Sequence, residues 1–135
     1  MKKVYTGKAL FSKCFRKQKN QSINSKKKEE VFIMEKSIIY KHIDHTVLKA
    51  VSSWEEIKKL CEEALEHNMA SVCIPPSYIK RVHETFGEKL NICTVIGFPL
   101  GYNTTEVKKA EVAQAIAEGA GEVDMVVNLG DVKNG

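Results

Sequence analysis

Hydrophobic and polar positions follow two different periods along residues 37–135. Short runs rich in β-branched and apolar residues, typical of buried strands, occur at 37–46, 70–75, 91–98 and 121–128. In the intervals between them, apolar residues recur at spacings of three and four, which predicts an amphipathic helix in each interval. The predicted order β-α-β-α-β-α-β indicates an α/β fold built on a parallel sheet.

The predicted helices carry local start and stop signals. Ser53 followed by Glu56 forms a capping box that begins the first helix. Gly87 and Gly119 stand where the second and third helices should end. The apolar faces predicted to be buried are, in chain order, Ile57, Leu60, Cys61, Ala64 and Leu65, then Ile79, Val82 and Phe86, then Val112, Ala113, Ile116 and Ala117.

The spacing of the strands leaves two architectures open. The corresponding positions Asp44, Cys73, Val95 and Asp124 are separated by 29, 22 and 29 residues, which suits a doubly wound sheet or part of a (β/α)8 barrel. No glycine pattern follows the first strand as a dinucleotide fingerprint would, so we expect no nicotinamide cofactor. The sequence ends after the fourth strand without a helix to cover it, and we expect a truncated fold.

Charge divides the chain into two parts. Residues 1–33 carry ten basic and two acidic residues, a net charge of +8, whereas residues 34–135 carry 11 basic and 15 acidic residues, a net charge of −4. The lysine-rich segment 1–33 has no sustained periodicity, and we expect a disordered extension. A nucleic-acid or membrane tether and a targeting presequence are the alternatives for it. The folded domain is predicted over residues 34–135.

Composition narrows the class of protein. With 43% hydrophobic and 28% charged residues and no apolar run of about 20, the chain reads as soluble, without a transmembrane helix. The cysteines lack metal-ligand spacing, and those in apolar stretches suggest buried, reduced thiols in a cytoplasmic protein. His42 and His45 in "HIDH" should face opposite sides of a strand, so we expect no metal there.

Polar residues within the predicted strands are the candidates for chemistry. Asp124 lies in the apolar stretch "GEVDMVVN", where burial of an unpaired carboxylate would cost several kcal/mol. Asp44 and Thr46 lie at the end of the first strand and Cys73 near the end of the second, and in parallel α/β folds chemistry gathers at such ends. Three of them have a structural alternative: Asp124 as a carboxylate hydrogen-bonded by neighbouring donors, Asp44 as a loop anchor and Cys73 as a small buried hydrophobic residue.

Five segments together resemble the deoxyribose-phosphate aldolase family, in the order and spacing of that family. They are "IDHTVLK" (43–49), "ASVCIPP" (70–76), "CTVIGFPLG" (93–101), "TTEVKKAE" (104–111) and "GAGEVDMVVNLG" (119–130). The resemblance implies the N-terminal half, about four βα units, of a TIM (β/α)8 barrel. It also implies reversible cleavage of 2-deoxyribose 5-phosphate to acetaldehyde and glyceraldehyde 3-phosphate through a lysine Schiff base, without a cofactor or metal.

The same resemblance assigns roles to residues. Asp124 matches the aspartate that moves protons during imine formation, Asp44 and Thr46 match substrate-pocket positions, and Cys73 matches a thiol lining the site. The Schiff-base lysine lies in a "KTSTG"-like segment, with a second lysine in a "KASGG"-like segment, and the 135 residues contain neither. We therefore expect this polypeptide to be inactive alone, and to aggregate or self-associate. A complete enzyme would take a phosphosugar and could form a homo-oligomer.

Two other functions compete with this interpretation. A non-catalytic flavodoxin-like binding domain would share the βα pattern but would need a ligand pocket at the loops that follow the strands. An interaction protein would use the basic segment 1–33 to bind nucleic acid, with the α/β part as a scaffold. Nucleic-acid binding is the less expected of the proposed partnerships, because the five matched segments favour the aldolase.

Overall fold

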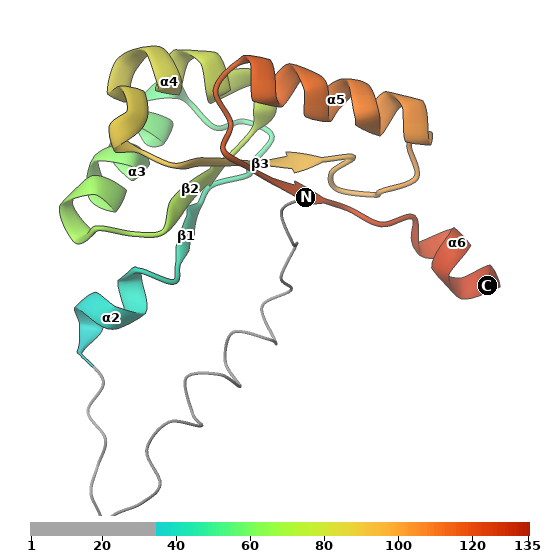
Figure 1. The fold of residues 1–135 in the computed structure, drawn as a ribbon, viewed down its shortest axis with the longest axis horizontal. Coiled ribbons are helices and arrows are strands. Elements are labelled where there is room, and N and C mark those ends of the chain that lie inside the picture. The colour runs from blue at the N-terminus through green and yellow to red at the C-terminus, as the bar shows by residue number, and fades with distance from the viewer. Residues whose placement is uncertain (1–34) are drawn as a thin grey trace, which may run out of the picture. The chain divides into compact units, whose positions relative to one another are not determined.

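The computed structural model describes residues 35–135, so the predicted state of residues 1–33 lies outside the described part. Eleven elements follow one another along these residues (Figure 1). They are α2 (Lys36–Tyr40), β1 (Asp44–Thr46), α3 (Trp54–His67), β2 (Ser71–Ile74), the 3-10 turn η1 (Pro76–Tyr78), α4 (Ile79–Phe86), the 3-10 turn η2 (Gly87–Lys89), β3 (Ile92–Ile96), α5 (Thr105–Ala117), β4 (Glu122–Met125) and α6 (Leu129–Asn134).

The four strands form one parallel sheet in the order β1-β2-β3-β4. Each strand lies beside the one before it, so right-handed crossovers that always advance in one direction place every connecting helix on the same face. A flavodoxin-like sheet would reverse its strand order at a switch point, and this sheet does not. The sequential order is that of half a (β/α)8 barrel, which resolves the two architectures left open by the strand spacing.

The hydrophobic core lies between the helices and one face of the sheet. Figure 1 shows α4 and α5 on the upper side of the strands. Ile57 from α3, Ile79 from α4 and Ala115 from α5 belong to the same buried cluster as Val72 and Ile96 from the strands. A second, smaller cluster of Cys73, Cys93 and Val95 lies apart from it, on the alternate strand positions. Within residues 35–135 the two sheet faces therefore differ: helices pack against one, and none of the helices in this range packs against the other, which is called the helix-free face below.

Two predictions about helix ends are confirmed. Ser53 accepts a hydrogen bond from the backbone N–H of Glu56, whose carboxylate accepts one from the N–H of Ser53, so α3 begins with the predicted capping box. Gly87 ends α4 with a φ of 59°, in the region that favours glycine. Along residues 35–135, none of the helices is both long enough and apolar enough to cross a bilayer.

Three predictions about burial and extent are wrong. The segment 37–46 begins as helix α2, and only Asp44–Thr46 pair as a strand. In α5, Ile116 is exposed, whereas Lys108 and Ala115 are the buried residues, because the helix is rotated relative to its predicted apolar stripe. Strand β4, expected to be buried on both faces, has four exposed residues, since it pairs only with β3 and forms an edge of the described sheet.

Candidate active site

The candidate residues meet on the helix-free face of the sheet. Parallel pairing places Thr46 beside Cys73 and Cys73 beside Cys93, and residues directly paired in this way project on the same side. Asp124 pairs with Val95, which lies two residues beyond Cys93 and therefore shares its face. Asp44, Thr46, Cys73 and Asp124, which the sequence singled out, are thus brought to one surface by four consecutive strands.

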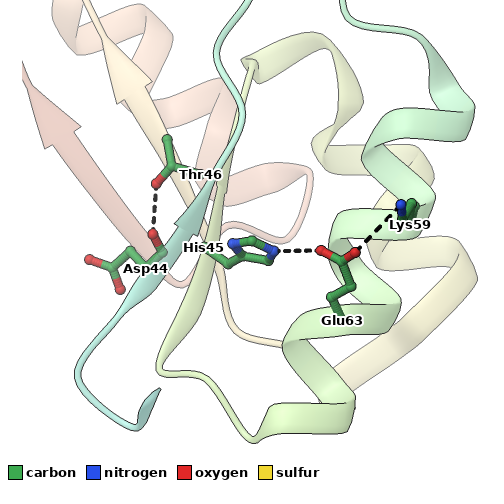
Figure 2. A network of polar contacts seen from close by, with 5 residues as sticks. All are labelled: Asp44, His45, Thr46, Lys59 and Glu63. Atoms are coloured by element: carbon green, nitrogen blue, oxygen red, sulfur yellow. Dashed lines mark hydrogen bonds and ion pairs between the residues drawn. The ribbon is translucent and has the colours of Figure 1, made fainter. Parts of the chain in front are cut away.

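His45 lies between Asp44 and Thr46 in the sequence but points to the opposite side. Figure 2 shows its ring directed at helix α3, where Nε2 lies 2.9 Å from Oε2 of Glu63. This hydrogen bond is the largest cause of a lowered pKa at Glu63, and the positive charge of Lys59 lowers it further. His42 instead lies 2.8 Å from the carbonyl of Ile38. The two histidines therefore have separate partners.

Asp44 and Thr46 are held by short-range hydrogen bonds at the end of the first strand. The hydroxyl of Thr46 donates to the carbonyl oxygen of Asp44 at 2.7 Å (Figure 2). The carboxylate of Asp44 accepts from the hydroxyl of Ser71, its partner on β2, also at 2.7 Å. Both Asp44 and Thr46 remain exposed, so each can contact a ligand on this face without losing its anchor.

Cys73, Cys93 and Asp124 form the densest group of reactive atoms on this face. The two thiol sulfurs and a carboxylate oxygen of Asp124 all lie within 4.8 Å of one another. The neighbouring Cys93 thiol lowers the pKa of Cys73. The pKa of Cys93 is raised, first by its interaction with the Cys73 thiol and then because it is buried beside negative charge. Such an arrangement can hold a proton, move one, or bind a cation.

The structure places two of these residues differently from expectation. Asp124 is exposed on edge strand β4 rather than buried among apolar neighbours, so in this chain its carboxylate needs no buried partner. Cys93 was not among the candidates, yet it is only 1% exposed and adjoins both Cys73 and Asp124. The sequence held one signal for Cys93. It lies two residues before Val95 on the same strand, so alternation places both side chains on one face, and Val95 is the residue that pairs with Asp124.

A buried lysine ties the loop after β3 to the end of β4. The ammonium of Lys108 donates to the carbonyls of Gly101 at 2.5 Å and Val126 at 2.7 Å. Gly101 has a φ of 72°, and a Cβ there would lie 2.1 Å from the carbonyl oxygen of Val127. The carboxylate of Glu111 accepts from the N–H of Gly97 at 2.7 Å. These contacts fix the strand that carries Asp124 against the neighbouring loop, a role that the sequence pattern did not indicate.

Comparison with known proteins identifies a family and individual relatives to which this chain is similar. The family described as DeoC/LacD family aldolase matches residues 38–134. A deoxyribose-phosphate aldolase of Clostridium botulinum (strain Alaska E43 / Type E3) is 60% identical over 101 residues, which cover 75% of this chain and 46% of the relative. That of Clostridioides difficile (strain 630) is 60% identical over 96 residues, covering 71% and 44%. The chain spans about half the length of the curated relatives it matches.

Solved structures agree with the family comparison. The aldolase QR15 superposes with a TM-score of 0.67 at 38% identity, over 71% of this chain and 43% of QR15. A tetrameric deoxyribose phosphate aldolase from Aeropyrum pernix superposes with a TM-score of 0.68 at 29% identity, over 71% of this chain and 42% of that protein. The similarity therefore extends from the sequence to the arrangement of strands and helices that positions the helix-free face.

Proposed function

The chain belongs to the DeoC/LacD family of aldolases, and on this premise we propose that it supplies part of the active site of a deoxyribose-phosphate aldolase. The proposed reaction is the reversible cleavage of 2-deoxyribose 5-phosphate to acetaldehyde and glyceraldehyde 3-phosphate. The observation that carries the proposal is the convergence of Asp44, Thr46, Cys73 and Asp124 on the helix-free face, in a chain 60% identical to relatives named for this activity.

The proposed mechanism uses a lysine amine that attacks the substrate carbonyl to form a carbinolamine and then an imine. Asp124 would donate a proton to the departing hydroxyl and recover it from water when the imine is hydrolysed. The protonated imine would accept the electron pair released as the carbon–carbon bond breaks, while the hydroxyl that becomes the departing aldehyde gives its proton to water and the resulting enamine carbon takes a proton from water before hydrolysis. Asp44 and Thr46 would bind substrate hydroxyls, and Cys73 would form the wall beside them. The exposure of Asp124 supports this role, because the carboxylate is accessible to a ligand.

We propose that the 135-residue polypeptide alone does not catalyse this reaction. Lys41, Lys49 and Lys133 are exposed, and a hydrated ammonium is a poor nucleophile. Lys108 is buried, but its ammonium is engaged by the carbonyls of Gly101 and Val126. The Schiff-base lysine would have to come from a segment like "KTSTG", which these 135 residues do not contain.

The first test is the intact mass and activity of the protein purified from its native source. A mass near twice the 15.2 kDa of this chain, with aldolase activity in that product, would support the proposal, whereas a mass near 15.2 kDa would exclude catalysis by this route. Asp124→Asn should lower kcat by about 100-fold or more, the scale of a lost general acid–base group. The matched control Asp131→Asn removes an exposed carboxylate on α6 and should leave kcat unchanged.

Two results would contradict these proposals. Equal activity in Asp124→Asn and Asp131→Asn would remove Asp124 from the mechanism. Acetaldehyde release from deoxyribose 5-phosphate by the purified 135-residue chain, abolished by Asp124→Asn, would show that a lysine within the chain suffices. Borohydride reduction in the presence of substrate would then identify that lysine, because a reduced imine leaves a covalent adduct on it.

The proposed function leads to further proposals on the binding partner, the oligomeric state and the cellular location. We propose a phosphosugar as the small-molecule partner and a homo-oligomer as the assembled enzyme, by analogy with the tetrameric Aeropyrum pernix relative. We propose a cytoplasmic location, supported by the three free, buried thiols at Cys61, Cys73 and Cys93. These proposals are tested on the native product by its mass under non-denaturing conditions and by cell fractionation.

A further inference from the structure

Three donor atoms on the helix-free face have the composition of a metal site. Cys73 on β2, Cys93 on β3 and Asp124 on β4 each offer one ligand atom, and all three atoms lie within 4.8 Å of one another. Two cysteine sulfurs and a carboxylate oxygen form a donor set that suits Zn²⁺. In sequence these residues are 20 and 31 positions apart, so they meet only because the strands are parallel neighbours.

The geometry fits a tetrahedral ion after a small adjustment. Zn–S bonds of about 2.3 Å at tetrahedral angles separate two sulfurs by roughly 3.8 Å. Donor atoms at most 4.8 Å apart therefore need to approach by about 1 Å, which side-chain rotation can supply. Cys73 and Cys93 are directly paired on adjacent strands, so the backbone already holds the two sulfur ligands side by side.

The electrostatics of this face favour a cation. The four strands contain no lysine or arginine, and Asp44, Glu122 and Asp124 occupy positions on the helix-free side. A divalent cation on this face would be attracted by these carboxylates and would stabilise both sulfurs as thiolates.

The three donor residues differ in their exposure to solvent. Cys73 is 3% exposed and Cys93 is 1% exposed, whereas Asp124 lies exposed on the edge strand. An ion can therefore enter at the carboxylate and reach the two sulfurs behind it. The same open side leaves room for a water molecule as the fourth ligand. Structural zinc sites are usually closed by four protein ligands, so this is the open type with three.

We propose that Cys73, Cys93 and Asp124 form a Zn²⁺ site in which two thiolates and one carboxylate bind the ion and water completes the tetrahedron. Binding displaces the thiol protons to solvent, so no oxidant or reductant is needed. The site consists of atoms of this chain alone and does not rest on the proposed aldolase function. In an aldolase that uses Asp124 to move protons, the same ion would engage the carboxylate and inhibit the reaction.

The test is a titration of the whole 135-residue chain with Co²⁺ and Zn²⁺ in a phosphine reductant, which does not contribute a thiol. Co²⁺ should produce a sulfur-to-metal charge-transfer band that saturates at one ion per chain, and Zn²⁺ should abolish it by displacement. X-ray absorption of the Zn²⁺ form should show two sulfur neighbours at about 2.3 Å and oxygen neighbours at about 2.0–2.2 Å.

Variants distinguish this site from other thiols. Cys93→Ala should weaken binding by about 100-fold or more, and Asp124→Asn should weaken it while retaining the sulfur band. Two controls should leave the affinity unchanged: Cys61→Ala, since that thiol is buried in the helix-side core, and Cys14→Ala, which lies outside the described residues. Far-ultraviolet circular dichroism of each variant checks that the fold is retained.

Three outcomes would overturn the proposal. The first is the absence of a charge-transfer band. The second is a band that survives Cys93→Ala and disappears in Cys14→Ala or Cys61→Ala. The third is an absorption spectrum of the unaltered chain with fewer than two sulfur neighbours. This last measurement needs no variant, so it decides the question even if Cys93→Ala fails to fold.

Discussion

At the scale of single residues, the alternation of a β-strand separates neighbours that the sequence joins. Asp44 and Thr46 project from β1 to the helix-free face, while His45 between them contacts Glu63 on α3. The same segment thus contributes to the candidate site and to the contact between sheet and helix. Alternation along the strand placed Asp44 and Thr46 on one face from the sequence, whereas the partner of His45 could not be predicted, because Glu63 lies 18 residues away.

The contact between His45 and Glu63 predicts a measurable titration. The hydrogen bond to His45 lowers the pKa of the Glu63 carboxyl below its ordinary value of 4.5. A depressed pKa means that this contact stabilises the fold above the unfolded pKa and that the contribution is lost as pH falls through the lower, folded value. Carboxyl-carbon NMR should therefore place the Glu63 midpoint below 4.5 in the unaltered chain.

Two substitutions separate the causes of that shift. His45→Ala should return the Glu63 midpoint towards 4.5, since it removes the largest cause. Lys59→Ala should move it less, because the charge of Lys59 is a smaller cause of the shift. A midpoint unchanged by His45→Ala would show that the ring does not hold this carboxylate in solution.

At the scale of elements, the boundary or buried face of a helix or strand could be predicted from the sequence only where the contacts that determine it lie close together in the chain. The boundaries of α3 were predictable because its capping box and apolar stripe lie within the helix sequence. The prediction for segment 37–46 was wrong because Ile38 and Ile39 have high strand propensity but lie in α2, where both side chains are exposed. The buried face of α5 also depended on distant partners, since Lys108 is buried by its bonds to Gly101 and Val126.

The capping box of α3 gives the prediction at this scale. Ser53→Ala removes the hydroxyl that accepts from the N–H of Glu56 and should lower the free energy of unfolding by about 1 kcal/mol. Ser52→Ala is the matched control, because its hydroxyl donates to the carbonyl of Lys49 outside the helix, and it should change stability by less than about 0.5 kcal/mol. Urea titration followed by circular dichroism measures the free energy of unfolding of both variants. Equal losses of stability would show that the Ser53 cap does not stabilise the fold.

At the scale of the whole molecule, the described sheet has two open edges and an uncovered face. Strand β1 pairs only with β2 and β4 only with β3, so backbone groups on their outer sides have no strand partner within residues 35–135. Met125 on β4 is 52% exposed, and Val127, Leu129 and Val132 beyond it are also exposed. Unpaired edges beside exposed apolar side chains are sites of association.

We therefore expect the 135-residue chain to self-associate, which light scattering after size-exclusion chromatography measures as a mass above 15.2 kDa. Met125→Glu adds a charge to the edge strand and should reduce association. Val51→Glu is the control: Val51 is 86% exposed, but it lies in the turn before α3, so its substitution should have no effect. A sharp monomeric peak with a cooperative thermal transition would contradict the prediction.

The sequence by itself determined the βα order, the start of α3, the identity of four candidate site residues and the resemblance to the aldolase family, because these depend on local periodicity and residue type. Tertiary structure alone decided the sequential strand order and therefore the single helix-covered face. It also decided the exposure of Asp124 and the meeting of Cys73 with Cys93. These features depend on the register between strands. The residues that pair in a parallel sheet are far apart in the sequence, so local sequence patterns do not determine that register.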